Sequence, residues 1–297
     1  MIKTLLFGKD GQVGWELQRS LAPLGELVAL GPEDADFEET EGLRDCVRRH
    51  RPDVIVNAAA YTAVDKAESE PERARTINAI APGVLAQEAL HGDAWLVHYS
   101  TDYVFDGSGE QYWLETDVTA PLSVYGATKL EGEQLIRQSG CKHLIFRTSW
   151  VYGTRGNNFA KTMLRLAQER DSLTVVNDQI GAPTGADLLA DITAHAIRAA
   201  RQREEVSGLY HLAAAGETSW HGYAGVVLDH AQRAGIPLKV APDAISSVPT
   251  SGFPLPAPRP LNSRLNTAKL RQTFDLNLPM WQTGVVRMLT EILVSGE

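Results

Sequence analysis

Tyr125 and Lys129 bring a phenol and an ammonium group within four residues of each other. On a helix these two side chains would project from the same side. A free phenol exchanges protons poorly at neutral pH, and a cation a few ångströms away lowers its pKa by favouring the phenolate. The spacing therefore predicts a tyrosine that acts as a general acid or base. An exposed tyrosine beside a solvated lysine is the alternative reading of the pair.

A hydroxyl group precedes this pair at Thr101, where the run Tyr99-Ser-Thr-Asp102 ends an apolar segment. We expect this segment to be a buried parallel strand, and parallel strands present the residues at their carboxyl ends to the ligand crevice. Thr101 is therefore predicted to hydrogen-bond the same substrate oxygen that receives the proton of Tyr125.

Three glycines, Gly8, Gly11 and Gly14, follow the first apolar run and lead into a helical pattern. Residues without Cβ allow a backbone to approach a pyrophosphate, which the free N–H groups and the dipole of the helix then hold. An ordinary strand-turn-helix with permissive glycines is the alternative. The position after the first strand of an alternating pattern favours a dinucleotide site.

The second strand of such a site often ends in a carboxylate that binds the ribose of NAD and repels the extra phosphate of NADP. Here that strand ends at Leu30-Gly31, and Glu33, Asp34 and Asp36 follow without an arginine. The sequence therefore leaves NADH and NADPH open, and we expect use of both.

The first half of the chain alternates short strands with helices, as expected for a parallel sheet with helices on both faces. Strands are predicted at 2–7, 27–30, 53–57, 94–99 and 143–147, and helices at 12–22, 39–49, 71–90 and 123–139. This pattern predicts the α/β class, with a Rossmann-type, doubly wound parallel sheet.

The second half is less regular. Helices are predicted at 157–170, 185–201, 220–234 and 279–293, and a strand at 209–212. We expect an NAD(P)-binding domain at 1–150, to which residues of about 172–202 return, and a smaller C-terminal substrate-binding domain at 151–297. The segment 248–260 contains five prolines, and it is either a linker or a rigid loop that walls the binding cleft.

Composition limits the partners of the chain. Its 297 residues carry a formal net charge of −9 at pH 7, which disfavours nucleic acids and anionic membranes as partners and leaves a small-molecule substrate. Cys46 and Cys141 lie far apart and form no CxxC pair, so we expect neither a disulfide framework nor a cysteine zinc site. No signal peptide or membrane span is evident, and a cytoplasmic location is expected.

Together these motifs resemble the extended, sugar-nucleotide branch of the short-chain dehydrogenase/reductase superfamily. Within that branch the chain is similar to the dTDP-4-dehydrorhamnose reductase family over nearly its whole length. The resemblance rests on the segments FGKDGQVGWELQ, DVIVNAAAYTAVDKAE, STDYVFDG, PLSVYGATKLEGE, FRTSWVYG, NNFAKTML, DQIGAPTG and RPLNSRLN. The chain departs from the family at Gly31, where an aspartate is frequent, and this weakens any preference for NADH.

The resemblance implies a role for each matching position. The cofactor would be bound by Gly8, Gly11, Gln12, Val13, Gly14, Asp36, Phe37, Ala60, Tyr61, Thr62, Tyr125 and Lys129. The sugar nucleotide would meet Thr101, Asp102, Tyr125 and Trp150. Core packing is the alternative for Trp150, and the resemblance favours a wall for the sugar ring. A magnesium ion at a homodimer interface would be bound by Glu16, Asp187 and Glu291, where the family more often has Glu at position 187.

The activity implied is NAD(P)H-dependent reduction of the C4 keto group of dTDP-4-dehydro-L-rhamnose, the last step of dTDP-L-rhamnose synthesis for O-antigen and other lipopolysaccharide sugars. Tyr125 would donate the proton, Lys129 would lower its pKa, and Thr101 would hydrogen-bond the carbonyl oxygen. Two alternatives remain, namely a sugar-nucleotide epimerase or dehydratase of the same fold and a non-catalytic NADP-binding regulatory subunit. No glutamate adjoins Asp102, which disfavours a dehydratase, and retention of Tyr125 and Lys129 favours catalysis.

Overall fold

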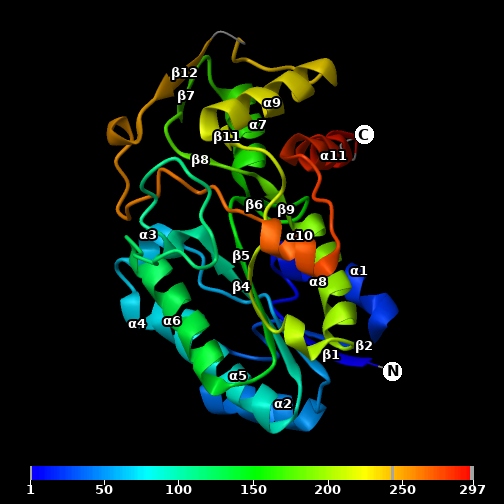
Figure 1. Ribbon diagram of the computed structural model, residues 1–297. Coiled ribbons are helices and arrows are strands. Elements are labelled where there is room, and N and C mark those ends of the chain that lie inside the picture. The colour runs from blue at the N-terminus through cyan, green and yellow to red at the C-terminus, as the bar shows by residue number, and fades with distance from the viewer. Residues whose placement is uncertain (1, 242–243, 295–297) are drawn as a thin grey trace.

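A parallel sheet of six strands forms the centre of the larger part of the molecule (Figure 1). The computed structural model describes residues 2–241 and 244–294. The sheet order is β10-β5-β4-β3-β1-β2, and each neighbouring pair is parallel. Its strands are β1 (Ile2–Phe7), β2 (Gly25–Leu30), β3 (Val54–Asn57), β4 (Trp95–Thr101), β5 (His143–Thr148) and β10 (Gly208–His211). The predicted α/β class and doubly wound sheet are confirmed.

Helices cover both faces of this sheet, because successive strand residues point to opposite faces and both faces are apolar. Val54 and Val56 face one side of β3, whereas Ile55 packs among the helices of the other side. The first face is covered by α1 (Gln12–Leu21), α8 (Ala186–Ala200) and α10 (Ala268–Phe274), and the second by α2 (Thr40–His50), α5 (Ala81–His91) and α6 (Val124–Ser139).

The strand order reverses beside β1, since β2 lies on one side of β1 and β3 on the other. At such a switch point the connections leave to opposite faces and open a crevice beyond the carboxyl ends of the strands. The crevice edge is therefore set by Phe7, Asn57 and Thr101, which end β1, β3 and β4.

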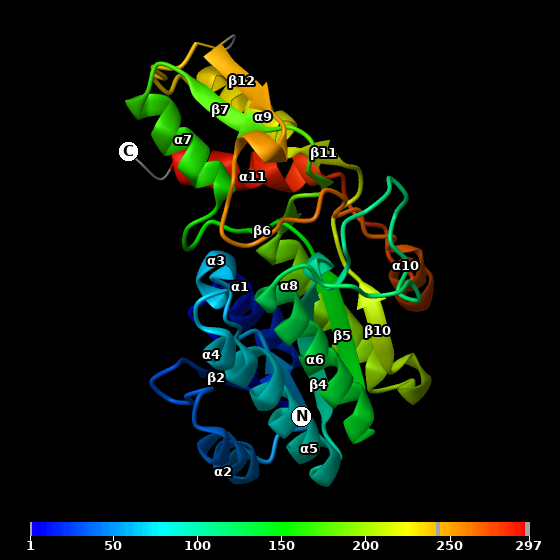
Figure 2. The same cartoon turned by 90° about the vertical axis from the view of Figure 1, so that its left-hand side faces the viewer.

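The smaller part of the molecule stands beyond this edge and has an apolar core of its own (Figure 2). Tyr223 and Val227 of α9 are buried there against Trp281 and Val285 of α11. Its elements are β6 (Val151–Tyr152), α7 (Phe159–Glu169), β7 (Leu173–Val176), β8 (Ile180–Gly181), β9 (Thr184–Gly185), β11 (Thr218–Ser219), α9 (Trp220–Arg233), β12 (Ile245–Val248) and α11 (Trp281–Val294). Strand β12, which pairs with β7, was not predicted.

The proline-rich segment is tied to both parts of the chain. The Thr250 hydroxyl donates to Asp178 (2.6 Å) at one end of the segment. At the other end, Arg259 donates to Asp65 (2.7 Å), which lies on α3 (Val64–Ala67). Because these bonds hold both ends, the segment is a fixed loop between the two parts and not a free linker.

Helix α6 packs very closely on the helical stretch that runs through α4 (Pro71–Arg75) and α5. This stretch was predicted as one helix, but its middle, Thr76–Ile80, is π-helical. A Cβ added at Gly132 of α6 would lie 2.3 Å from the carbonyl oxygen of Asn78. Asn78 in turn accepts from the backbone N–H of Tyr61 (2.9 Å), so the absent side chain of Gly132 lets α6 sit at its depth beside the crevice.

Substituting alanine for Gly132 is expected to destabilise the fold by about 1–3 kcal/mol, because the added methyl group overpacks a backbone that cannot easily move. Gly225 of α9 is the matched control, since a Cβ there would meet no atom within 4 Å. Gly225→Ala should instead stabilise by about 0.5–1 kcal/mol. Urea unfolding of both variants measures the difference, and equal effects would contradict the close packing of α6.

Candidate functional site

A crevice of about 390 Å³ lies at the switch point and contains most of the predicted chemistry. Contributions come from the glycine turn, from the ends of β3, β4 and β5, and from α6. It is lined by Gly11, Gln12, Val13, Ala58, Ala60, Thr62, Val64, Tyr99, Ser100, Thr101, Asp102, Tyr103, Tyr125, Lys129, Thr148, Ser149, Trp150 and Val151.

The glycine turn has the geometry of a cradle for a phosphate. A Cβ at Gly8, whose φ is +84°, would lie 2.7 Å from the nitrogen of Ala59, and one at Gly14 would lie 1.9 Å from the oxygen of Gly8. Gly11 is the N-cap residue of α1, and no side chain caps the helix there. The free N–H groups of its first turn are thus available to an anion, and the residues present fit a dinucleotide.

Tyr125 and Thr101 meet at the carboxyl end of β4. Burial raises the pKa of Tyr125 to about 12, and a hydrogen bond with the Thr101 hydroxyl offsets only part of this rise. The expected lowering of the Tyr125 pKa by Lys129 is therefore wrong for the ligand-free protein. The physical reason is that burial disfavours the phenolate more than nearby polar groups favour it. Tyr125 is a protonated donor at neutral pH.

Lys129 is buried on α6, one turn from Tyr125 and 2% exposed. Its ammonium nitrogen donates to the carbonyl oxygen of Tyr99 (2.6 Å) and lies 3.3 Å from Nε2 of His98. Burial lowers the pKa of Lys129 to about 8, and the nearby Glu133 only partly opposes this. The predicted pair thus shares one crevice, but the lysine is itself partly neutral near pH 8.

Asp102 places a carboxylate at the same edge. Its Oδ1 accepts from the Thr101 hydroxyl (3.1 Å), and Oδ2 has no hydrogen-bond partner among the described residues. Burial raises the pKa of Asp102 to about 6, although the hydroxyls of Ser263 and Thr101 favour its charged form. A buried acceptor without a partner suits a hydroxyl group of a bound ligand.

Trp150 forms a wall of the crevice and does not belong to a hydrophobic core cluster. Its ring stacks on Trp220 with centroids 3.7 Å apart, and a Cβ at Gly181 would lie 2.8 Å from its Cε2. The indole is therefore held between α9 and β8 with its backbone at a φ of +50°. A held aromatic face can cover the C–H groups of a sugar ring.

Several predicted cofactor residues lie outside the lining of the crevice. Phe37 is buried against Phe7 (ring centroids 5.6 Å apart). Asp36 accepts from the N–H of Glu38 (2.8 Å). The hydroxyl of Tyr61 donates to Glu70 (2.8 Å). Gly8 and Gly14 belong to the turn but are not among the residues that line the crevice.

The three carboxylates expected to bind magnesium line one small cavity, together with Arg287. Arg287 pairs with Asp187 (3.4 Å) and donates to Glu291 (3.1 Å), while Arg19 donates to Glu16 (3.3 Å). Arginines thus supply the positive charge that a cation would bring. Across residues 2–241 and 244–294, no group of three or more His, Cys, Asp or Glu side chains could hold a metal ion, so the expectation of magnesium finds no support.

Sequence reasoning missed several residues of the crevice. Tyr103 packs edge-on against Tyr125 (ring centroids 5.5 Å apart). Ser100 and Thr148 carry buried hydroxyls without a hydrogen-bond partner among the described residues. Only their position at the carboxyl ends of β4 and β5 signals them in the sequence.

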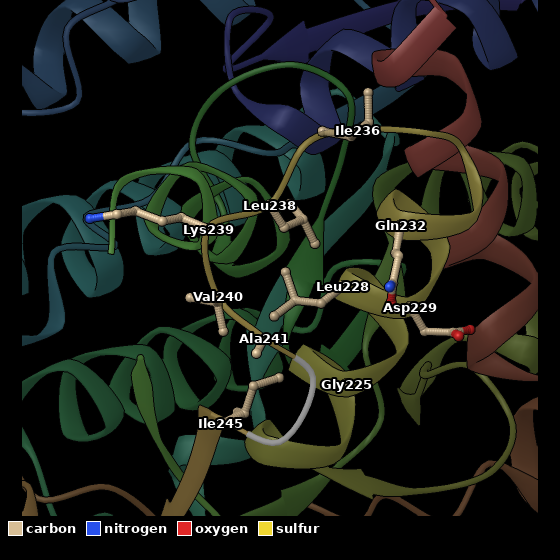
Figure 3. A pocket seen from close by; sticks show the side chains of 10 residues that line it. All are labelled: Gly225, Leu228, Asp229, Gln232, Ile236, Leu238, Lys239, Val240, Ala241 and Ile245. Carbon is tan, nitrogen blue, oxygen red and sulfur yellow. The ribbon is translucent and has the colours of Figure 1, made fainter. Parts of the chain in front are cut away.

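A larger cavity, of about 500 Å³, lies between α9 and the segment 236–241 (Figure 3). Leu228 and Leu238 point into it, whereas the ammonium group of Lys239 points away. Apart from Asp229, Gln232 and Lys239 its lining is apolar, and it contains neither the glycine turn nor Tyr125, so we do not regard it as the reaction site. In the part of the chain that the structure describes, no helix is long and apolar enough to cross a bilayer.

Comparisons with known proteins give one consistent match. The family model described as the RmlD substrate binding domain matches residues 2–294. The dTDP-4-dehydrorhamnose reductase of Salmonella typhimurium is 60% identical over 295 residues, with 98% of each protein covered. The protein of that name from Burkholderia thailandensis is 46% identical, with 98% of this chain and 99% of the relative covered.

Solved structures agree with this match. The dTDP-4-dehydrorhamnose reductase of Bacillus anthracis, in complex with NADP, superimposes with a TM-score of 0.88 at 35% identity and covers 98% of this chain and 99% of its own. The UDP-glucose 4-epimerase of Thermus thermophilus, in complex with NAD, has a TM-score of 0.79 at 18% identity, with 100% of both chains covered. The second likeness shows the fold alone.

Asp102→Asn is expected to stabilise the fold at neutral pH. The folded carboxyl titrates near pH 6 and the unfolded one near about 3.9. Between these values the folded state binds more protons, so the free energy of unfolding falls as pH rises through this window. Asparagine does not titrate, so the variant does not lose this stability. The gain in unfolding free energy should approach about 3 kcal/mol at neutral pH and vanish near about pH 4.

Urea titrations at the two pH values measure this gain. Asp106→Asn is the control, because hydrogen bonds from Ser108 lower the pKa of that exposed carboxyl, and its loss should bring no stabilisation at neutral pH. A gain for Asp102→Asn that is the same at both pH values would contradict the raised pKa.

Proposed function

Because the chain belongs to the RmlD family of dTDP-4-dehydrorhamnose reductases, we propose that it reduces the C4 carbonyl of dTDP-4-dehydro-L-rhamnose to the alcohol. The observation that carries the proposal is the meeting of Tyr125, Thr101 and Lys129 in one crevice with the glycine turn. A proton donor and a dinucleotide cradle in one crevice suit a carbonyl reduction.

The nicotinamide cofactor, when bound, would supply the hydride. The N–H groups of Gln12 and Val13, next to Gly11, would hold its phosphates, and Lys129 would bind its ribose. Ala58 and Ala60, whose small side chains line the crevice beside the turn, leave room for it. The cradle does not distinguish NADPH from NADH, and we propose that the chain uses either.

The proton of the new hydroxyl group would come from Tyr125. Its raised pKa keeps the phenol protonated at neutral pH, so Tyr125 has a proton to donate. Thr101 would donate a hydrogen bond where negative charge develops on the carbonyl oxygen, and such general acid help contributes roughly 10²- to 10⁴-fold. Asp102 and Trp150 would orient the sugar, which adds the benefit of positioning.

Domain roles and assembly follow as proposals. The sheet part, up to about residue 150 with α8 returning to it, would bind the cofactor, and the smaller part would bind the sugar nucleotide. Strand β10 and α10 also pack with the sheet. A homodimer stays a prediction of the family resemblance, and light scattering with and without EDTA would measure it.

An epimerase or dehydratase is less well supported. The T. thermophilus epimerase shares the fold at 18% identity, whereas the S. typhimurium reductase is 60% identical. A non-catalytic subunit would have no need of the buried Lys129 and the partly buried Tyr125 in one crevice. Neither alternative has an observation of its own.

Tyr125→Phe should remove most turnover, by roughly 10²-fold or more, because the proton donor is lost. NADPH affinity should stay nearly unchanged, since the ring itself remains. The loss of NADPH absorbance in the presence of the 4-keto sugar measures turnover, and NADPH fluorescence measures binding. Tyr223→Phe is the matched control, because that buried hydroxyl has no hydrogen-bond partner among the described residues. Wild-type turnover in Tyr125→Phe would refute the assignment.

Trp150→Ala should raise KM for the sugar nucleotide by roughly 10-fold or more while KM for NADPH changes little. The indole lies at the wall of the crevice that the smaller part of the chain completes, and a lost aromatic contact is worth about 0.5–1.5 kcal/mol beyond the loss of buried area. Steady-state kinetics with each substrate varied in turn separates the two constants. Equal increases in both would show that Trp150 only supports packing.

A further inference from the structure

Behind Lys129, the side chains of His98 and Asn57 form a buried row of nitrogen contacts that leads away from the crevice. His98 and Asn57 are neighbours across the parallel strands β4 and β3, and they are 0% and 1% exposed. Nδ2 of Asn57 lies 3.1 Å from Nδ1 of His98, and Nε2 of His98 lies 3.3 Å from Nζ of Lys129. The proposed mechanism uses neither His98 nor Asn57.

The orientation of the Asn57 amide is fixed by its other end. Its Oδ1 accepts from the backbone N–H of Ala59 (3.0 Å). If the amide were turned over, its NH2 group would face the backbone N–H of Ala59, and two donors would meet. Nδ2 must therefore be the group that points at His98. Nδ1 of His98 therefore accepts a hydrogen bond and carries no proton.

A neutral imidazole has one N–H group, so with Nδ1 as acceptor the proton must be on Nε2. That N–H points at Lys129. An ammonium group has three donors and no lone pair, and it cannot accept from Nε2–H. A neutral amine can accept from Nε2–H while it donates to the carbonyl oxygen of Tyr99, 2.6 Å away. The hydrogen bonds are all satisfied only when Lys129 is the amine.

The charged groups around Lys129 do not reverse this preference. Glu133, one turn further along α6, favours the ammonium form. Its carboxylate is already committed to Arg147 of β5, which donates to it twice (2.9 and 2.6 Å). Tyr125 on α6 and Asp102 beyond β4 line the crevice. Burial keeps Tyr125 neutral and raises the pKa of Asp102 to about 6, so Asp102 is the one of the two that can carry a charge at neutral pH.

We propose that His98 is a positioning residue that acts through Lys129. Its Nε2–H, held in that tautomer by Asn57, favours the neutral amine in the ligand-free enzyme and sets the pH above which Lys129 no longer offers a charge to the cofactor. The role in cofactor binding rests on the proposed function, whereas the tautomer and the amine do not. Burial lowers the pKa of His98 well below its usual range, in keeping with a neutral ring.

The tautomer is tested directly in the ligand-free protein. Long-range ¹H–¹⁵N correlation spectra of ¹⁵N-histidine-labelled enzyme show which ring nitrogen is protonated, and His98→Gln assigns the signal. We expect a neutral ring with the proton on Nε2 and a hydrogen-bonded acceptor at Nδ1. A proton on Nδ1, or a doubly protonated ring, would overturn the proposal.

The effect on Lys129 is tested with the same variant. Glutamine can turn an acceptor oxygen toward Lys129, so His98→Gln should make the lysine titrate at a proton concentration about tenfold lower than in the wild type. ¹³C spectra of lysine-labelled protein measure this titration, and Lys129→Met assigns its signal. The alkaline loss of NADPH affinity should move by the same amount.

His143→Gln is the matched control, because that histidine lies on β5, where its Nδ1 faces the carbonyl oxygen of Cys141 (2.9 Å) and not Lys129. It should leave the titration of Lys129 unchanged. If His98 served packing alone, His98→Gln would lower stability without moving that titration, and the proposal would fall. Failure to reduce the keto sugar would refute the proposed function and leave the two NMR results standing.

Discussion

The burial of one amine determines how the rest of the crevice works. Lys129 sits where β4 ends, and its nitrogen is surrounded by a backbone carbonyl, an imidazole and the inner side of α6. Taking a charge out of water costs several kcal/mol, so the surroundings decide whether the charge exists at all. The carboxylate of Glu133, which favours the charged form of Lys129, is bound by Arg147. Lys129 and Asp102, with pKa values of about 8 and about 6, titrate on either side of neutral pH, so a bound cofactor meets groups that can still change their protonation state.

Much of this arrangement could be predicted from the sequence, because local patterns report local geometry. The glycines after the first apolar run predict the turn that β1 and α1 form. The four-residue spacing of Tyr125 and Lys129 predicts their shared side of α6. Apolar strands alternating with helices predict the doubly wound sheet, and the carboxyl ends of those strands predict where Thr101 and Asp102 lie.

The remainder depends on contacts between distant residues, which no local pattern reports. The contact between His98 and Asn57 depends on the register of β3 and β4, which the sequence alone does not give. The pKa of Tyr125 rises because Tyr103 and residues that follow β3 pack around its ring, and burial cannot be read from spacing. The three carboxylates did come together as expected, but Arg287 came with them, one helical turn before Glu291.

A tyrosine with a raised pKa is consistent with the direction of the proposed reaction. A base that removes a proton from an alcohol must be ionised first, and burial makes that step costly for Tyr125. A donor need only hold its proton until the carbonyl oxygen becomes negative. An alkoxide is a stronger base than a phenolate, so transfer from Tyr125 stays favourable even though burial has weakened the acid. Burial therefore costs a proton donor less than it would cost a proton acceptor, and the raised pKa of Tyr125 keeps the phenol protonated at neutral pH.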